Sequence, residues 1–232
     1  MEKQKYAAIV LAAGSGKRMN SQVHKQYLII QDRPVLYYSL KAFEDSAVDE
    51  IVLVVGKGEE EFCRKEIVDK YGISKVKAIV EGGKERYHSV FEGLKQTSDA
   101  DYVLIHDGAR PFVNQEIIRR CMLEVPEYQA CVVGMPVKDT IKIAAEGGYA
   151  KQTPDRKNVW MIQTPQTFSY ALIYEAYEEM LKTEDTAITD DAMVLERIKG
   201  KKSKLIEGSY RNIKITTPED LLIANVYLQH PE

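Results

Sequence analysis

The chain has 232 residues, of which 44% are hydrophobic, enough to bury a sizeable core in one domain or, at most, two. Its formal net charge of -3 excludes a general basic surface for nucleic acid, so any anion-binding site has to be local. No stretch approaches the ~18 apolar residues of a membrane span, and the N-terminus lacks the apolar core of a signal peptide.

The first predicted element is a buried strand, because small apolar residues occupy positions 7–11 without interruption. A glycine turn follows, Ala12-Ala13-Gly14-Ser15-Gly16, whose small side chains allow a ligand to approach the backbone amides. Lys17 and Arg18 come directly afterwards and Lys25 a little later, and cations beside exposed amides suit a polyphosphate.

Two known phosphate-binding loops match this turn poorly. A Walker A loop needs Ser or Thr after Gly-Lys, but Arg18 stands there. A Rossmann fingerprint needs a third glycine, but Met19 occupies its position. An ordinary strand–helix turn with solvated cations is the alternative.

Strands and helices alternate through the next hundred residues. We expect helices at 34–43, 59–71, 85–96 and 114–124, the last capped by Asn114, and strands at 51–55, 76–80, 102–105 and 130–135. This alternation predicts an α/β fold with a Rossmann-like, mostly parallel sheet and helices on both faces. Ligands of such sheets bind beyond the carboxyl ends of the strands.

Two further motifs follow strands of this sheet. Gly82-Gly83 comes before a helix that holds Ser89, and backbone groups there can recognise the edge of a base; a simple tight turn is the alternative. Asp107 directly ends an apolar strand, where a carboxylate can hold Mg²⁺ or a ribose hydroxyl. A structural ion pair with Arg110 is the alternative for Asp107, and we expect His106 to be a core residue.

The alternation stops at Pro136. Segments 137–143 and 154–162 favour β structure and flank Gly147-Gly148, which predicts a long hairpin arm at about 137–159. Its outer half is polar and it has little core of its own. We therefore hypothesise that the arm crosses to a second subunit in a twofold homodimer.

The rest of the chain returns to the main body. We expect a helix at 169–181, another opened by Thr189-Asp190-Asp191 with its acids as caps, a solvated basic turn at 199–204 and a short strand at 212–215. Thr217 and Pro218 begin the last helix as N-cap and first residue. The three cysteines Cys63, Cys121 and Cys131 match no zinc spacing, so we expect buried thiols and a cytoplasmic location.

The glycine turn resembles the signature of nucleotidyltransferases, with His24 in place of their usual proline before the lysine. The order and spacing of five motifs resemble the 2-C-methyl-D-erythritol 4-phosphate cytidylyltransferase family over nearly the whole chain. These motifs are HDGARPF (106–112), VKDTIK (137–142), QTPQTF (163–168), TDDA (189–192) and NIKITTPEDL (212–221). The resemblance implies a single nucleotidyltransferase domain, 1–232. It also implies transfer of CMP from CTP to methylerythritol phosphate, with release of pyrophosphate, on the non-mevalonate route to isoprenoids.

The same resemblance implies roles for particular residues. Arg18 and Lys25 would stabilise the transition state at the CTP phosphates, and Arg156 and Lys214 would position the attacking phosphate. The implied CTP contacts are Ala12, Ala13, Gly14, Gly16, Lys17, Gly83, Ser89, Asp107 and Ala109. The implied contacts to the polyol phosphate are Asp107, Arg110, Asp139, Thr140, Arg156, Thr164 and Lys214, with Thr140 and Arg156 serving the neighbouring subunit. Mg²⁺ would bridge the triphosphate oxygens, with Asp107 as its protein ligand.

Other functions remain open at this point. A ribitol 5-phosphate cytidylyltransferase would share the CTP site and differ only where the acceptor is recognised. A nicotinamide-dependent oxidoreductase could use the glycine turn, although the missing third glycine argues against it. A catalytically dead nucleotide-binding regulator is disfavoured because all four cationic positions are present.

Overall fold

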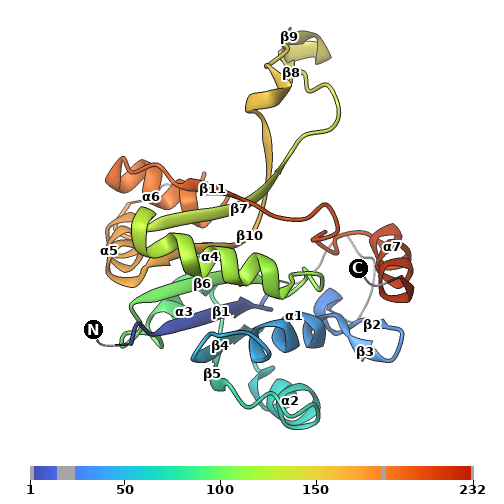
Figure 1. Ribbon diagram of the computed structural model, residues 1–232, viewed down its shortest axis with the longest axis vertical. Coiled ribbons are helices and arrows are strands. Elements are labelled where there is room, and N and C mark those ends of the chain that lie inside the picture. The colour runs from blue at the N-terminus through green and yellow to red at the C-terminus, as the bar shows by residue number, and fades with distance from the viewer. Residues whose placement is uncertain (1–2, 15–23, 184–186, 231–232) are drawn as a thin grey trace.

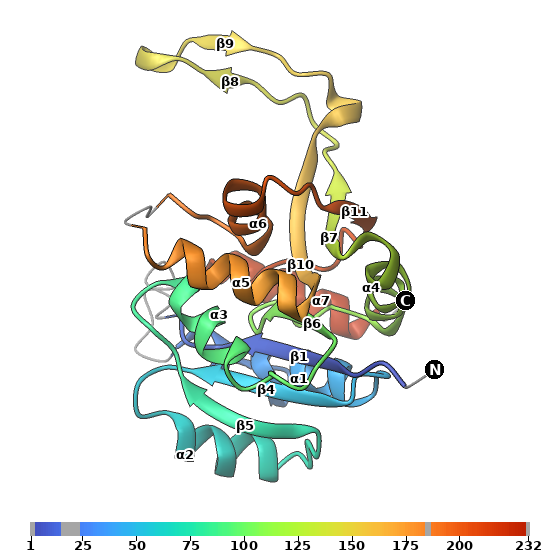
Figure 2. The same ribbon diagram turned by 90° about the vertical axis from the view of Figure 1, so that its left-hand side faces the viewer.

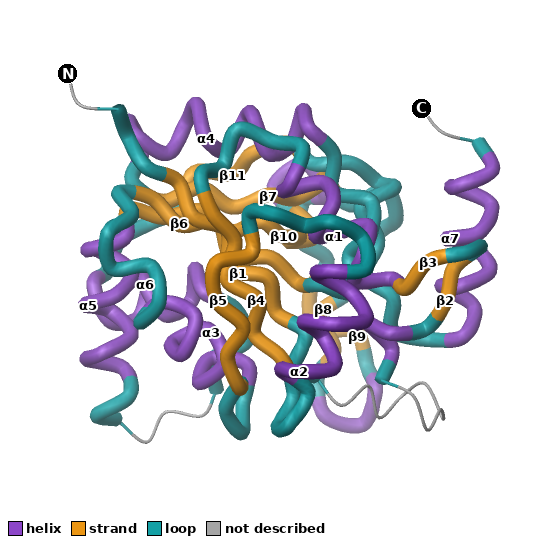
Figure 3. The backbone as a smooth tube through the Cα atoms, turned by 90° about the horizontal axis from the view of Figure 1, so that it is seen from below, coloured by secondary structure: helices purple, strands orange, loops and turns teal. Residues whose placement is uncertain are grey.

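The computed structural model describes residues 3–14, 24–183 and 187–230. A seven-stranded sheet in the order β11-β7-β10-β6-β1-β4-β5 runs through the middle of the molecule, with helices on both sides (Figures 1 and 3). Strand β10 is antiparallel to its neighbours β6 and β7, and the other pairs of this sheet are parallel. The strands are β1 Tyr6–Leu11, β4 Glu50–Val55, β5 Val76–Glu81, β6 Tyr102–Asp107, β7 Ala130–Pro136, β10 Trp160–Ser169 and β11 Lys204–Glu207. The predicted α/β class and mostly parallel sheet are confirmed.

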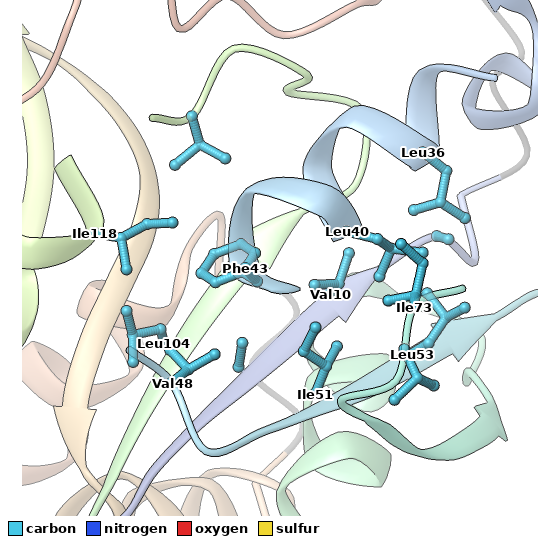
Figure 4. Close-up of a cluster of buried hydrophobic side chains, with 14 of the residues drawn as sticks. Val10, Leu36, Leu40, Phe43, Val48, Ile51, Leu53, Ile73, Leu104 and Ile118 are labelled. Carbon is cyan, nitrogen blue, oxygen red and sulfur yellow. The ribbon is translucent and has the colours of Figure 1, made fainter. Parts of the chain in front are cut away.

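Each face of the sheet has its own core. Helices α1 (Val35–Glu44), α2 (Glu60–Cys63) and α4 (Gln115–Tyr128) cover one face, where Figure 4 shows part of the buried cluster. Helices α3 (Arg86–Leu94), α5 (Tyr170–Met180) and α6 (Asp191–Lys199) cover the other face. Along β1, Ala8 and Val10 pack on the first face and Ala7 and Ile9 on the second. Burial on both faces explains why this strand is an uninterrupted apolar run.

Most predicted elements are confirmed to within a few residues at their ends. Asn114 caps α4 as expected, with its Oδ1 accepting a hydrogen bond from the Ile117 amide at 3.0 Å. The predicted helix at 59–71 is instead divided into α2 and a π-helical turn, η3 (Arg64–Asp69). A 3.6-residue apolar period does not distinguish an α-helical turn from a wider one, so the sequence pattern missed this change.

The predicted strand at 212–215 is wrong. This segment joins no sheet; the Arg110 guanidinium donates to the Asn212 carbonyl at 2.8 Å, and the Ile215 amide donates to the Ala109 carbonyl at 2.8 Å. The strand lies earlier, as β11, which pairs with β7 and begins at Lys204 in the supposed basic turn. Only Ile206 of this short edge strand is buried, so its apolar signal was too weak to predict it.

The arm leaves the sheet between β7 and β10 and projects far from the body (Figures 1 and 2). Its tip is a small hairpin of β8 (Ile143–Ala144) and β9 (Ala150–Gln152), closed by the turn η4 (Glu146–Gly148). Gly147 and Gly148 have φ values of 76° and 81°, which confirms the predicted glycine turn because this region favours glycine. The predicted long strands are wrong: strand pairing within the arm is confined to its tip, and at its base the Val137 amide donates to the Val159 carbonyl at 3.0 Å, while residues 156–158 form the 3-10 turn η5.

The C-terminal helix α7 (Pro218–Gln229) packs beside the small sheet of β2 (Ile29–Ile30) and β3 (Arg33–Pro34), and its Ala224 is buried with Ile30, Val35 and Ile215. Thr217 is its N-cap and Pro218 its first residue, as the sequence predicted, and Thr217 and Asp220 form a reciprocal capping box there. All three cysteines are buried free thiols, which is also as predicted. Among the helices described, none is both long and apolar enough to traverse a bilayer.

Candidate active site

A cavity of about 370 Å³ lies at the carboxyl ends of β1 and β6, beside the start of α3. The parallel arrangement of these strands brings motifs from distant parts of the sequence to this one edge. The predicted nucleotide-binding and catalytic residues that line it are Ala12, Ala13, Gly14, Lys25, Gly83, Ser89, Asp107, Ala109 and Lys214. Gly16, Lys17 and Arg18 lie outside the described residues.

The glycine turn after β1 is held to the sheet and to the segment that follows it. The Ala12 amide donates to the Val54 carbonyl at 2.6 Å, continuing the β-ladder past the end of β1. Gln26 is fully buried, and its amide nitrogen donates to the carbonyls of Ala12 and Gly14. The sequence analysis did not single out Gln26, because a lone glutamine carries no chemical signal.

Glycines 82 and 83 allow a second close approach. A Cβ atom on Gly82 would lie 2.6 Å from both Ala13 Cβ and Ser89 Oγ, and one on Gly83 would lie 2.3 Å from His88 Cβ. The Gly83 amide donates to Ser89 Oγ at 3.1 Å. The backbone of this turn can therefore lie directly against the glycine turn of β1, so both loops form one wall of the cavity.

Asp107 is the centre of a cationic cluster. Its Oδ2 lies 2.8 Å from Lys214 Nζ and 3.7 Å from Arg110 Nε, and its Oδ1 accepts a hydrogen bond from Arg86 Nε at 3.3 Å. Burial alone would raise the pKa of this carboxyl, but the charges of Arg86, Lys214 and Arg110 hold the pKa of Asp107 well below its usual range. Asp107 is therefore ionised at neutral pH, and the predicted pairing with Arg110 is only one of three such contacts.

A second cavity of about 160 Å³ adjoins the first, because Arg86, Asp107 and Lys214 line both. Arg110 and Thr164, which were predicted as substrate contacts, line this smaller cavity. Thr164 Oγ1 accepts a hydrogen bond from the Asp107 amide at 3.1 Å and lies 3.0 Å from His106 Nδ1. The two cavities together form one cleft, and they meet at Arg86, Asp107 and Lys214.

His106 is a core residue, as predicted. Its ring is fully buried, and its two nitrogens lie within hydrogen-bond distance of Thr164 Oγ1 and of the Arg110 carbonyl. Burial lowers the pKa of His106 to about 4, so the ring is neutral at physiological pH.

The main feature missed from the sequence is an ion pair behind the cleft. Arg86 binds Asp191 through two hydrogen bonds of 2.8 Å, and the Tyr177 hydroxyl donates to the same carboxylate at 2.6 Å. Both acids at the start of α6 were predicted to be caps. That is correct for Asp190, which accepts from the Met193 amide, and wrong for Asp191, whose side chain is fully buried. The arginine inside the Gly82–Ser89 motif was the available signal.

The structure does not bring the arm residues to this cleft. Asp139, Thr140 and Arg156 are exposed and line neither cavity. The Arg156 guanidinium donates to the Lys138 carbonyl at 2.8 Å, at the base of the arm. Within one subunit, three of the predicted substrate contacts therefore lie apart from the others.

A mostly parallel α/β sheet, with glycine turns and several cations around one cleft at its carboxyl edge, defines a protein that binds nucleotides or other phosphorylated ligands. Comparison with known sequences narrows this class. The profile of the 2-C-methyl-D-erythritol 4-phosphate cytidylyltransferase family matches residues 6–230. The chain belongs to this family of nucleotidyl-transferring enzymes.

Individual relatives agree with this assignment. A 2-C-methyl-D-erythritol 4-phosphate cytidylyltransferase of Lachnospira eligens is 54% identical over 96% of this chain and 98% of the relative. One of Lachnoclostridium phytofermentans is 51% identical over 97% of both chains. Among solved structures, a 4-diphosphocytidyl-2C-methyl-D-erythritol synthase from Anaerococcus prevotii matches with a TM-score of 0.86 and 38% identity, over 98% of this chain and 97% of that one.

Proposed function

We propose that the cleft around Asp107 is the active site in which CMP is transferred from CTP to 2-C-methyl-D-erythritol 4-phosphate. The products are 4-diphosphocytidyl-2-C-methyl-D-erythritol and pyrophosphate, in a step of isoprenoid precursor biosynthesis. The observation that supports this site most directly is the meeting of Lys25, Lys214 and both glycine turns around one cavity. The names of relatives at about half identity favour this acceptor over ribitol 5-phosphate, and they leave no support for an oxidoreductase.

The reaction needs charge stabilisation more than proton transfer. The attacking phosphate monoester is already ionised near neutral pH, so no general base is required. His106 suits this chemistry as a bystander, because its ring is neutral and both its nitrogens have polar neighbours. The barrier lies in bringing two anions together and in stabilising charge at the CTP α-phosphate.

We assign the larger cavity to CTP. Its triphosphate lies against the backbone of Ala12, Ala13 and Gly14 and beside Lys25. Gly16, Lys17 and Arg18, which lie outside the described residues, are further CTP contacts by the sequence resemblance. The base lies against Gly83 and Ser89, and the ribose near Asp107 and Ala109. Lys25 and Arg18 are the cations that stabilise the transition state at the transferred phosphate.

We assign the smaller cavity to the acceptor, whose phosphate binds Lys214 close to the point where both cavities meet. Arg110 and Thr164 contact the polyol there. Lys214 already contacts Asp107 at 2.8 Å, so it is held near the reacting centre before the substrate arrives. This preorganisation avoids moving a cation during the reaction.

The residues present fit a Mg²⁺ ion that is held mainly by the triphosphate. Mg²⁺ binds nucleotides through one or two carboxylates together with phosphate oxygens and water, and Asp107 is a buried, ionised carboxylate in the cleft. Because Arg86, Arg110 and Lys214 already contact Asp107, the triphosphate would supply most of the ligands. Among the described residues no group of three acidic, histidine or cysteine side chains forms a protein-only site. When bound with CTP, the ion would neutralise triphosphate charge and favour pyrophosphate as the leaving group.

We further propose a cytoplasmic homodimer in which each arm reaches the other subunit's cleft. Asp139, Thr140 and Arg156 contact no substrate within their own subunit in this arrangement, and the arm has little core of its own. It also exposes Ile143 and Tyr149, which suits burial against a partner. The free thiols fit a reducing compartment.

One assay tests the function and the acceptor together. Purified protein is incubated with CTP, Mg²⁺ and either methylerythritol phosphate or ribitol 5-phosphate, and pyrophosphate release is followed. We expect release with methylerythritol phosphate, and a loss of about 10²–10³-fold in kcat/KM for Lys25→Ala and for Lys214→Ala. Near-normal turnover in either variant would contradict the role given to that lysine.

Subunit mixing tests the arm. Lys214→Ala and Arg156→Ala proteins are each expected to be nearly inactive. If the arm acts in the other subunit, random exchange gives hybrids with one intact site, and activity recovers to about a quarter of wild type. No recovery, with exchange verified by mass spectrometry, would place Arg156 outside the partner's cleft.

A further inference from the structure

Lys25 belongs to a short 3-10 turn, η2 (Lys25–Tyr27), that is anchored on both sides of this residue. Gln26 donates to the carbonyls of Ala12 and Gly14, which ties the turn to the glycine loop. Tyr27 and His24 both contact Glu59 instead. The Lys25 side chain lines the cleft between these anchors.

Glu59 is well placed to hold this turn. Its Oε2 accepts hydrogen bonds from the Tyr27 hydroxyl at 2.7 Å and from the Gly56 amide at 2.9 Å. Its Oε1 lies 2.8 Å from His24 Nδ1, an ion-pair distance at which the two groups are not aligned for a hydrogen bond. A Cβ atom on Gly56 would lie 2.6 Å from Oε2, so glycine there lets the carboxylate fold back over the end of β4.

The contact is extended by a buried thiol. Tyr27 Oη lies 3.1 Å from Cys63 Sγ, at the end of α2. Burial raises the pKa of the Cys63 thiol to about 11, and burial also raises the pKa of Tyr27, so both groups keep their protons at neutral pH. Because the Tyr27 proton goes to Glu59, the thiol is the donor to Tyr27. Cys63, Tyr27 and Glu59 thus form one directed chain of hydrogen bonds.

We propose that Glu59 is a positioning residue of the reaction: it fixes the turn that carries Lys25 and so sets where this ammonium meets the triphosphate. This inference rests on the proposed function, in which Lys25 contacts CTP. Glu59 itself lines neither cavity, so it acts only through the turn. Misplacing a catalytic group by about 1 Å costs up to about 10²-fold in rate, which sets the size of the expected effect.

A double-mutant cycle tests this assignment by steady-state kinetics with CTP and methylerythritol phosphate. Glu59→Ala is expected to lower kcat about 10- to 100-fold in the wild-type background, with an unchanged KM for methylerythritol phosphate. In the Lys25→Ala background the same change is expected to have no further effect, because the group that Glu59 positions is gone. Glu59→Gln, which still accepts from Tyr27, is expected to restore part of the rate.

Glu61→Ala is the matched control, since Glu61 is an exposed acid two residues away on α2 and is expected to keep wild-type kinetics. Tyr27→Phe removes a single hydroxyl and is expected to lower kcat in the same direction, which keeps the test valid if Glu59→Ala does not fold. The role of Glu59 would be contradicted if Glu59→Ala lowered kcat by the same factor in the wild-type and Lys25→Ala backgrounds. It would also be contradicted if Glu59→Ala and Tyr27→Phe both kept the wild-type kcat. Either result would leave the active-site assignment standing. Wild-type activity in Lys25→Ala would overturn the active-site assignment and this inference with it.

Discussion

Changing Asp191 to asparagine isolates the ion pair behind the cleft. The Asp191 carboxylate is fully buried and accepts three hydrogen bonds, two from Arg86 and one from Tyr177. Asparagine has nearly the same shape but offers one acceptor oxygen and an NH₂ group. At least one donor would then face another donor, and the Arg86 charge would lose its closest partner.

The size of the effect follows from burial. Removing one partner of a buried ion pair costs about 3–5 kcal/mol. Arg86 keeps 29% of its side-chain exposure and a second contact to Asp107 at 3.3 Å, so we expect a value near 3 kcal/mol, at the lower end of this ~3–5 kcal/mol range. In a chain of 232 residues, that loss lowers the melting temperature by about 6–12 °C.

Thermal unfolding followed by circular dichroism measures this shift, and urea unfolding checks the free energy. Asp190→Asn is the matched control, because asparagine caps a helix about as well as aspartate and the loss should stay below about 1 kcal/mol. A melting temperature of Asp191→Asn within about 2 °C of wild type would contradict this prediction, since losing the closest partner of the Arg86 guanidinium should cost about 3 kcal/mol.

Three further outcomes follow from buried groups. The pKa of His106 is about 4 in the folded protein and ~6.5 in the unfolded chain, so the unfolded chain binds more protons between these pH values. The free energy of unfolding should therefore fall as the pH drops from ~6.5 to about 4. Urea unfolding of His106→Gln at several pH values should show no such fall from this residue. Gly93→Ala places a Cβ 2.5 Å from Ile9 Cγ2 and should cost about 1–3 kcal/mol in urea unfolding. Burial raises the pKa of Cys121 to about 12, so mass spectrometry should find it unmodified by iodoacetamide at pH 8 until the protein unfolds.

The sheet and the position of the cleft were predictable because each depends on local patterns. Strands buried on both faces have to be apolar throughout, and in a parallel sheet their carboxyl ends meet at one edge. Gly14 and Gly83 each follow a strand of this sheet and Asp107 ends another, so their convergence needed no knowledge of side-chain packing. Lys214 lines the cleft as predicted, although the strand predicted around it does not exist. Hydrogen bonds with Ala109 and Arg110 hold its segment there instead.

The pairing of Arg86 with Asp191 was not predictable in the same way. The two residues are 105 positions apart, and an acid in the first turn of a helix is usually explained by the helix dipole. Asp191 is buried and Asp190 is a cap because of the direction in which α6 faces the sheet. That direction depends on how α5 and α6 pack beside α3. The short strands of the arm and β11 escaped prediction for a related reason, since their pairing partners supply most of their stability.

The cleft that we propose for two anionic substrates contains a buried carboxylate, and electrostatics gives a reason. Arg86, Arg110 and Lys214 all lie within 3.7 Å of Asp107, and without that negative charge they would repel one another when no substrate is bound. The carboxylate keeps them close together, at the cost of competing with the incoming phosphate for Lys214. Since Asp107 stays ionised throughout the physiological range, this competition is constant with pH. Substrate binding then has only to exchange one partner of Lys214 for another, and the cations need not be gathered from solvent.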